Sequence, residues 1–234
     1  MGVIDSQVQG SDKNLMAERV LLNGAGDSEF NEAVNTAVRY INAGEVIVVA
    51  AEFGYIYLAD AFDKDAVKAV HILRGDQSGV AAQVFIKDVK VLTGIAKNSN
   101  INQDQLFAKF WPGLLSVTLN CQPGLSWDLG DGQRLGKVNV RVPNRKFLNH
   151  ILQSTGPLVA GSVALTGKSV VRDLAKLPIY ESDVGAIFDE GVLAEGPAST
   201  WLEISENEIT VKRVGAISIE QLQVVIPSIS APNL

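Results

Sequence analysis

The sequence is poor in the residues that build most metal and redox sites. Its 234 residues include one cysteine and two histidines. The single cysteine, Cys121, excludes a disulfide within the chain, and its place in a strand-like apolar run predicts a small core residue. His71 and His150 stand in no metal-ligand spacing with Cys121 or with each other, so the sequence predicts no metal site. We expect both histidines to be structural or solvent-exposed.

Long hydrophobic runs are also missing. No stretch approaches the roughly 18 uninterrupted apolar residues that a membrane span needs. The first residues, MGVIDSQVQGSDKN, lack the basic start and apolar run of a signal peptide. Together with the single cysteine, this favours a reducing compartment, so we expect a cytoplasmic protein with no membrane partner.

Positive charge is in the minority, and the common phosphate-binding loops are absent. The chain has 20 Lys and Arg against 26 Asp and Glu, a net charge of −6, which argues against a broad nucleic-acid footprint but allows a local basic cleft. There is no G-x-x-x-x-G-K-[ST] loop and no G-x-G-x-x-G after a strand. The glycine-rich stretch 129–137 reads as a hairpin or long loop, and TGKS (166–169) as a plain turn.

What the sequence does contain is an interleaved series of helical and strand-like patterns, typical of an α/β domain with a mixed sheet. Since 47% of the residues are hydrophobic, the chain can bury a large core. The expected helices are 27–44, 63–73, 102–110, 144–156 and 218–226. The expected strands are 45–51, 81–88, 114–120, 137–143, 157–167, 186–191, 199–205 and 208–218.

No internal repeat or linker divides the chain, so we expect a single domain over 26–226. Residues 1–25 are polar and contain glycine, and we expect them to form a flexible N-terminal tail. Residues 227–234 are expected to form a C-terminal tail. From these features alone, the chain is an α/β domain of unknown activity.

An ordered series of short motifs changes this interpretation. FWPGLLSVTLN (110–120) is followed by KVNVRVPN (137–144), GPLVAGSVALTG (156–167), GPASTWLEIS (196–205) and VKRVGAIS (211–218). The series resembles the YrdC family of L-threonylcarbamoyl-AMP synthases, which carry such a Phe-Trp-Pro-Gly corner and an Arg-x-Pro strand end in this order. SWDLGD (126–131) resembles the actinobacterial branch in particular. The resemblance covers about residues 30–226, nearly the whole expected domain.

The resemblance implies a single twisted mixed-sheet α/β domain with an open concave cleft. It also implies a nucleotidyltransferase that joins ATP, L-threonine and bicarbonate to give threonylcarbamoyl-AMP and pyrophosphate. Magnesium is expected with the ATP if the chain is active. tRNA is expected to be reached only indirectly, through a downstream transferase that modifies the adenosine beside the anticodon.

The sequence departs from the family where the family holds its substrates. In the Pro-Thr-(Asp/Glu)-Thr-x-Tyr-Gly segment the proline, both threonines and the glycine are replaced, by Ala50, Ala51, Phe53 and Ile56, while the acid remains as Glu52. In the Lys-x-Arg segment, Arg74 takes the place of the lysine, but Asp76 stands where the arginine would be. The asparagine of Ser-Ala-Asn is replaced by Ala164.

The resemblance implies seven candidate binding residues, because most of the family positions at which they stand line the nucleotide and threonine site: Tyr55, Arg74, Arg141, Ser162, Ser199, Thr200 and Arg213. No residue is assigned a catalytic role. Two functions therefore stay open: a threonylcarbamoyl-AMP synthase-like protein with impaired activity, and an inactive paralogue whose cleft binds a nucleotide, RNA or a protein partner. A third class, an assembly protein without a small ligand, would need a protein partner alone.

Overall fold

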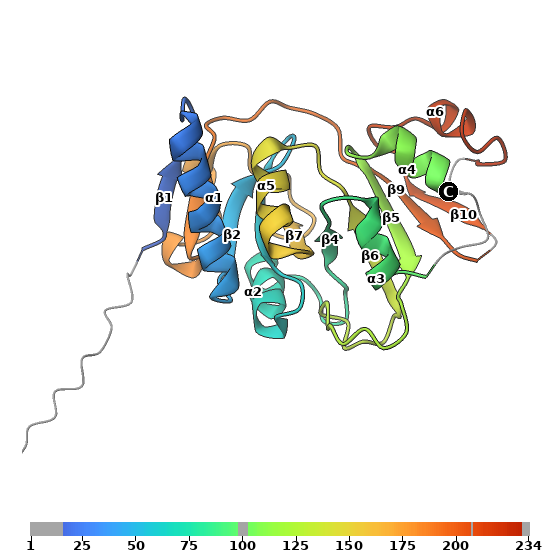
Figure 1. The fold of residues 1–234 in the computed structure, drawn as a ribbon, viewed down its shortest axis with the longest axis horizontal. Coiled ribbons are helices and arrows are strands. Elements are labelled where there is room, and N and C mark those ends of the chain that lie inside the picture. Colours follow the sequence, from blue (N-terminus) through green and yellow to red (C-terminus); the bar gives the residue numbers. More distant parts are fainter. Residues whose placement is uncertain (1–15, 98–102, 207, 231–234) are drawn as a thin grey trace, which may run out of the picture.

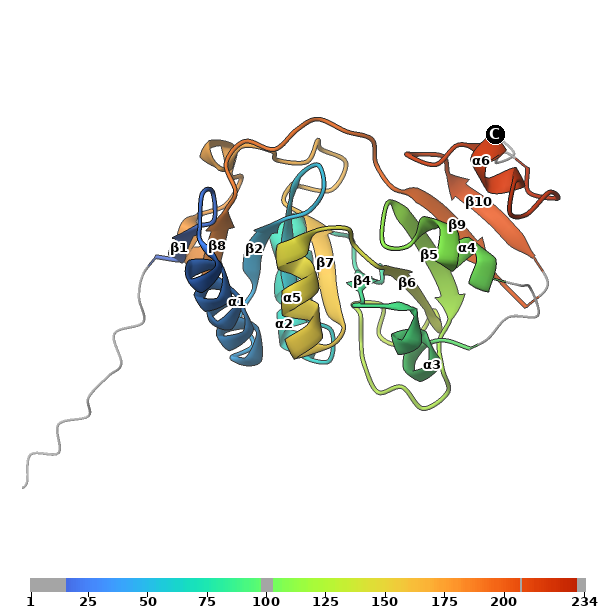
Figure 2. The same ribbon diagram turned by 45° about the horizontal axis from the view of Figure 1, so that its top comes forward.

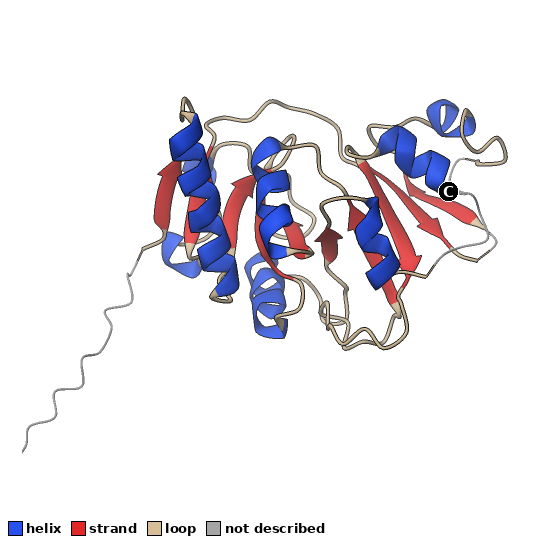
Figure 3. Cartoon of the chain, viewed as in Figure 1, coloured by secondary structure: helices blue, strands red, loops and turns tan. Residues whose placement is uncertain are grey.

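The computed structural model describes residues 16–97, 103–206 and 208–230 as one α/β domain. Helices and strands alternate along the chain, as the sequence predicts (Figure 3). The strands are β1 Glu18–Leu21, β2 Ile47–Ala50, β3 Tyr55–Asp60, β4 Gln83–Phe85, β5 Leu115–Asn120, β6 Lys137–Arg141, β7 Leu158–Ser162, β8 Ala186–Asp189, β9 Thr200–Ile204 and β10 Ile209–Arg213. The helices are α1 Asp27–Asn42, α2 Lys64–Arg74, α3 Leu92–Ile95, α4 Asp104–Phe110, α5 Lys146–Thr155 and α6 Ile219–Gln223.

The strands form a 10-stranded mixed sheet in the order β1-β8-β2-β3-β7-β4-β6-β5-β9-β10. β1 and β2 pair with β8 in parallel, β4 pairs with β6 in parallel, and β5 pairs with β9 in parallel. The other neighbours are antiparallel. The sheet runs across the whole molecule from β1 to β10 (Figure 1). The predicted single mixed-sheet α/β fold is confirmed.

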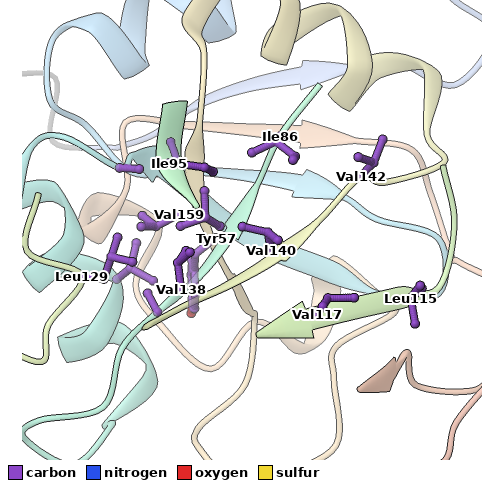
Figure 4. Close-up of a cluster of buried hydrophobic side chains, with 14 of the residues drawn as sticks. Tyr57, Ile86, Ile95, Leu115, Val117, Leu129, Val138, Val140, Val142 and Val159 are labelled. Atoms are coloured by element: carbon purple, nitrogen blue, oxygen red, sulfur yellow. The ribbon is translucent and has the colours of Figure 1, made fainter. Parts of the chain in front are cut away.

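Helices cover both faces of the sheet. α1 and α5 lie side by side on one face (Figure 1 and Figure 2), where their apolar side chains pack with those of β2, β3 and β8. α2 contributes Ala66, Val67 and Val70 to a second cluster, which continues to α3, α4 and α6. Figure 4 shows part of this cluster, in which Val117 and Val140 come from the neighbouring strands β5 and β6, and Val159 comes from β7, on the far side of β4. Because residues in a strand point alternately to opposite faces, the intervening positions are free to line a site.

Local sequence explains where several helices begin and end. Asp63 caps α2 by accepting hydrogen bonds from the amides of Asp65 and Ala66, and Gly75 ends the helix at a positive φ of 61°. α4 ends at Trp111, whose ring stacks on Phe107 with centroids 4.2 Å apart. The Trp111 indole also donates to the Leu115 carbonyl at 2.7 Å. Trp111 is therefore a packing residue at a helix-to-strand corner.

The structure differs from the sequence-based expectation at both ends of the domain. Residues 18–21 of the predicted N-terminal tail form β1, an edge strand that pairs in parallel with β8. The prediction of a flexible tail is therefore wrong for these residues. In the predicted C-terminal tail, Ile229 is only 3% exposed and packs into the core. The remaining residues of both predicted tails, 1–15 and 231–234, lie outside the described residues.

Candidate functional site

A cavity of about 740 Å³ lies between α2, the sheet and several loops. In the order of the sheet, the strands from β3 through β7, β4, β6, β5 and β9 to β10 contribute residues to its walls. The cavity therefore extends along the sheet across several strands. Its polar and charged lining comprises Glu52, His71, Arg74, Asp76, Gln83, Ser116, Asn139, Arg141, Ser162, Thr166, Lys168, Ser169, Ser199 and Arg213. Five of the seven predicted binding residues line it: Arg74, Arg141, Ser162, Ser199 and Arg213.

The cavity gathers positive charge in a chain whose net charge is −6. Four cations line it, Arg74, Arg141, Lys168 and Arg213, against two carboxylates, Glu52 and Asp76. The local balance of charge is therefore opposite in sign to that of the whole chain. Such a cavity attracts an anionic ligand, and attracts it most strongly when water is displaced.

At the α2 end, Asp76 holds Arg74. The Arg74 Nε donates to Asp76 Oδ2 at 3.0 Å, and its Nη1 donates to the Ser162 carbonyl at 2.7 Å. Thr166 Oγ1 donates to Asp76 Oδ1 in a short hydrogen bond. Burial raises the pKa of Asp76, but the hydrogen bond from Thr166 and the charge of Arg74 outweigh it, so the pKa lies below its usual value. Asp76 is thus a fixed, ionised carboxylate.

His71 joins the same group of contacts. Its Nδ1 lies 2.9 Å from Asp76 Oδ2, and its Nε2 lies 2.8 Å from the Leu129 carbonyl oxygen. The two ring nitrogens therefore tie the end of α2 to the Leu129 backbone and to Asp76. His71 lines the cavity, although the sequence alone predicted only a structural or exposed residue.

In the middle of the cavity, Arg141 is buried against Glu52. Arg141 is 6% exposed, its Nε donates to the Gly113 carbonyl at 2.8 Å, and its Nη2 forms an ion pair with Glu52 Oε1. Burial lowers the pKa of Arg141, and the Glu52 carboxylate opposes that effect. The other carboxylate oxygen, Glu52 Oε2, is buried and has no hydrogen-bond partner among the described residues. The pair therefore leaves one buried carboxylate oxygen unsatisfied.

Polar side chains from four neighbouring strands form a ladder of hydrogen bonds across the sheet. Gln83 Nε2 donates to Asn139 Oδ1 at 2.6 Å, and Asn139 Nδ2 donates to Thr118 Oγ1 at 3.0 Å. The Trp201 indole donates to the same Thr118 oxygen at 2.8 Å. The opposite face of these strands is apolar, with Val84, Val117, Val140 and Leu202 in the core. The alternation thus gives this end of the sheet one dry face and one polar face.

At the β9–β10 end, Arg213 lies over Ser199. Its Nε donates to the Ser199 carbonyl at 3.1 Å, and its Nη2 donates to the Ser199 hydroxyl at 3.1 Å. Neither Arg213 nor Lys168 forms an ion pair with a carboxylate in the described part of the chain. Arg213 is exposed, with donors to spare. It is therefore available to bind an anion.

Two predicted binding residues do not line the cavity. The Tyr55 hydroxyl donates to the Gly191 carbonyl at 2.7 Å and accepts from the Glu190 amide at 3.0 Å. Thr200 is 0% exposed, and its hydroxyl bonds the backbone of residues 215–217. Both hydroxyls are used to hold loops against the sheet. We therefore remove Tyr55 and Thr200 from the residues proposed to contact ligand.

Apolar contacts join the loops around the cavity. The Phe53 ring, where the family has a threonine, packs on Gly196; a Cβ at that glycine would lie 2.3 Å from the ring. Val170 packs in the same way on Gly54, with a Cβ distance of 2.4 Å. Phe53 thus places an aromatic ring beside the 196–199 segment, at a position where the family has a hydroxyl group. Sequence analysis identified this replacement, but not that the ring would face a glycine.

Several lining residues were missed by the sequence analysis. Gln83 lies in no motif used there, Asn139 lies in KVNVRVPN without having been singled out, and Thr166 and Lys168 were both placed in a plain turn. The alternation of polar and apolar residues in KVNVRVP, which marks Asn139 as facing away from the core, is the one signal that could have found it. For the other three we find no local signal, because only the tertiary fold brings them to the cavity.

The described residues contain no group of three or more His, Cys, Asp or Glu side chains that could hold a metal ion. The two carboxylates of the cavity, Glu52 and Asp76, are each paired with an arginine. Among the described helices, none has the length and hydrophobicity that a membrane span requires.

Comparison with curated proteins finds relatives over most of the chain. A protein of Mycobacterium leprae, provisionally named a threonylcarbamoyl-AMP synthase, is 28% identical over 200 residues, 85% of this chain and 90% of its own length. The threonylcarbamoyl-AMP synthase of Bacillus subtilis is 29% identical over 199 residues, 81% of this chain. This chain covers only 55% of the length of the Bacillus protein.

Comparison with solved structures supports the fold. A double-alanine variant of Sua5 from Pyrococcus abyssi superposes with a TM-score of 0.81 at 22% identity, over 90% of this chain and 64% of that one. Sua5 in complex with L-threonine gives a TM-score of 0.78 at 22% identity, over 92% of this chain and 62% of that one. Escherichia coli YciO gives 0.70 at 19% identity, over 87% of this chain and 97% of that one.

A family model decides the classification. The Sua5/YciO/YrdC model, whose description reads "Telomere recombination", matches residues 39–215. The match includes both ends of the cavity, from Glu52 to Arg213. Together with the relatives and the fold, it shows that this chain belongs to the Sua5/YciO/YrdC family and is threonylcarbamoyl-AMP synthase-like.

Proposed function

We propose that this protein forms threonylcarbamoyl-AMP from ATP, L-threonine and bicarbonate. The observation that carries the proposal is the cavity itself: four cations line a space of about 740 Å³ in an otherwise acidic chain. Named synthases among the relatives match 81% to 85% of the chain, which supports the same reaction class. The product would be passed to a separate transferase that modifies tRNA.

The reaction makes defined demands on the cavity. The threonine amine attacks the carbon of bicarbonate, water leaves, and a carbamate forms. A carbamate oxygen then attacks the α-phosphorus of ATP, and the bond to the bridging oxygen breaks as pyrophosphate departs. Catalysis requires that the carbamate lie close to the α-phosphorus and that cations stabilise the phosphate charge.

The described residues meet these demands unequally. Arg213 is free of carboxylates and can contact a phosphate or a carboxylate group. Arg141 supplies buried positive charge in the middle of the cavity, although Glu52 neutralises much of it. Arg74 is held by Asp76, Ser162 and Thr166, so it has little left to give a substrate. We therefore expect a rate below that of a relative that keeps the family's substrate-holding residues.

A second function is favoured by one specific observation, the ion pair between Arg74 and Asp76. A cavity that neutralises one of its own phosphate-binding cations can still hold a nucleotide but position it poorly for adenylyl transfer. In this alternative the protein binds nucleotide and does not form the adenylate. Charged hydrogen bonds contribute roughly 1.5–3 kcal/mol each, so losing a few of them removes several powers of ten in rate.

The experiment that tests the proposal measures both products. The purified chain is incubated with ATP, L-threonine, bicarbonate and magnesium, and threonylcarbamoyl-AMP and pyrophosphate are separated by chromatography. The Bacillus subtilis synthase serves as the positive control, and omission of threonine as the negative control. Adenylate that depends on threonine supports the proposed reaction. If ATP binds in a parallel titration but no adenylate forms, the alternative is supported. If no adenylate forms and ATP does not bind, both functions are contradicted.

A further inference from the structure

One row of side chains across the sheet carries no charge where it lines the cavity. The strand register places five residues side by side on β7, β4, β6, β5 and β9: Ala160, Gln83, Asn139, Thr118 and Glu203. Because directly paired residues point to the same face of a sheet, these side chains share one face. Ala160, Gln83 and Asn139 line the cavity, so two side-chain amides are its polar groups in this row.

The two amides do not use all of their hydrogen-bonding groups on each other. Gln83 Nε2 donates to Asn139 Oδ1, and Asn139 Nδ2 donates to Thr118 Oγ1. The Gln83 carbonyl oxygen, Oε1, accepts no hydrogen bond from the described residues, and each amide nitrogen carries a second hydrogen. Gln83 therefore keeps a free acceptor beside a free N–H donor of Asn139.

Neighbouring contacts fix these amides and surround them with apolar surface. The Trp201 indole donates to Thr118 Oγ1 at 2.8 Å, so the row of hydrogen bonds is held at its β9 end. Trp201 itself lines the cavity, as do Ala82 and Ala160, which stand next to Gln83 along β4 and across the sheet. Fixed amides with apolar flanks suit a planar, uncharged ring that bears donors and acceptors on its edge.

Two arginines stand beside this row on the same face of the sheet. Arg141 follows Asn139 by two residues on β6, so it lies about 6.6 Å farther along the strand. Arg213 pairs with Trp201, which precedes Glu203 by two residues on β9. Because β6 and β9 run antiparallel and parallel to β5, respectively, both arginines lie on the same side of the row. A nucleotide with its phosphates at these arginines can place its base over the amides.

We propose that Gln83 and Asn139 bind the edge of the nucleotide's base and select adenine. Adenine presents its N6 amine as a donor beside ring-nitrogen acceptors, which matches the Gln83 carbonyl and the Asn139 N–H. Hypoxanthine has a carbonyl oxygen in place of the amine, so two acceptors would face each other at Gln83. This inference rests on the proposed binding of ATP, but not on whether the adenylate is formed.

The first test uses the unmodified chain and two nucleotides that differ only at the base. The affinities of ATP and inosine triphosphate are measured by titration calorimetry, with inorganic tripolyphosphate as a ligand that has no base. ATP should bind about tenfold more tightly than inosine triphosphate, because hypoxanthine leaves the Gln83 carbonyl without a donor. Equal affinities for the two nucleotides would overturn the inference.

Two variants then separate the base from the phosphates. Gln83→Met keeps the length of the side chain and removes its amide, so the preference for ATP over inosine triphosphate should fall to less than about threefold. The affinity for tripolyphosphate should change less than about threefold in this variant, because no charge is altered. Arg213→Gln is the opposite control: it should weaken all three ligands and keep the preference for ATP. Thermal unfolding of each variant verifies that it is folded.

Two further results would overturn the inference: a preference for ATP that Gln83→Met retains in full, or one that Arg213→Gln abolishes as well. If Gln83→Met does not fold, the comparison of ATP with inosine triphosphate on the unmodified chain decides alone. Failure of the inference differs from failure of the proposed reaction, because a chain that forms the adenylate equally well from both nucleotides keeps the reaction and refutes the selection of adenine. If the unmodified chain binds neither nucleotide, the inference is wrong.

Discussion

Replacing the buried hydroxyl of Thr200 should cost stability and not ligand affinity. The hydroxyl donates to the Ile217 carbonyl at 2.7 Å and accepts from the amides of Gly215 and Ile217, both at 2.9 Å. In Thr200→Val the shape is kept and all three backbone groups lose their partner. At about 1 kcal/mol or more for each unsatisfied group, we expect the free energy of unfolding to fall by at least about 3 kcal/mol. Domains of this kind have only about 5–15 kcal/mol in total.

The assay is equilibrium unfolding in urea, with ATP affinity measured on the same preparations. Thr200→Ser is the matched control, because it keeps the hydroxyl and removes one methyl group, at a cost of about 1 kcal/mol. We expect ATP affinity to change less than threefold in both variants under conditions where they are folded. A stability loss below about 1 kcal/mol in Thr200→Val, together with ATP binding weakened tenfold, would refute the structural role given to this hydroxyl.

Three further predictions concern the other groups of the cavity. Glu52→Gln leaves the buried Arg141 charge without a carboxylate, so urea unfolding should show a loss of about 3 kcal/mol or more; an unchanged midpoint would contradict this. Gly161→Ala places a Cβ 2.5 Å from the Arg74 Cδ, and thermal unfolding should show a loss of about 1–2 kcal/mol, whereas a more stable variant would show that the side chain moves freely. The pKa of Asp76 is lowered in the fold from 3.8, so its contribution to stability is present above that pH and is lost as the pH falls below it. The stability difference between the unmodified chain and Asp76→Asn, followed by urea unfolding at decreasing pH, should therefore shrink in that range, and a difference independent of pH would contradict the assignment.

Much of the fold could be predicted because its strands and helices carry strong local patterns. The helical spacing of Ala33, Ala37 and Ile41 predicted α1, and the apolar run 45–51 predicted β2, which the structure places at Ile47–Ala50. β1 was missed because it is a four-residue edge strand, half exposed and held mainly by its pairing with β8. β3 was read only as a motif, since YIYLAD is buried at nearly every position and has no alternation.

The candidate site could be predicted less well, because the direction of a side chain depends on tertiary contacts. Arg74, Arg141 and Arg213 all line the cavity, as do Ser162 and Ser199, whereas Tyr55 and Thr200 do not. The hydroxyls of Tyr55 and Thr200 bond loop backbone instead, which the sequence gives no means to foresee. The replacement of a cation by an acid at position 76 was visible in the sequence. That this acid would pair with Arg74 required the turn at Gly75 to bring them together.

The most direct test of the proposed function is the transfer of labelled carbon from bicarbonate into an adenylate. The chain is mixed with ¹⁴C-bicarbonate, ATP, L-threonine and magnesium, and the label that migrates with threonylcarbamoyl-AMP is counted. We predict label in this product only when ATP and threonine are both present, and a large reduction in the Arg213→Gln variant. No label above the level without threonine, while the Bacillus subtilis synthase gives product in the same mixture, would contradict the proposal that this family member carries out the reaction.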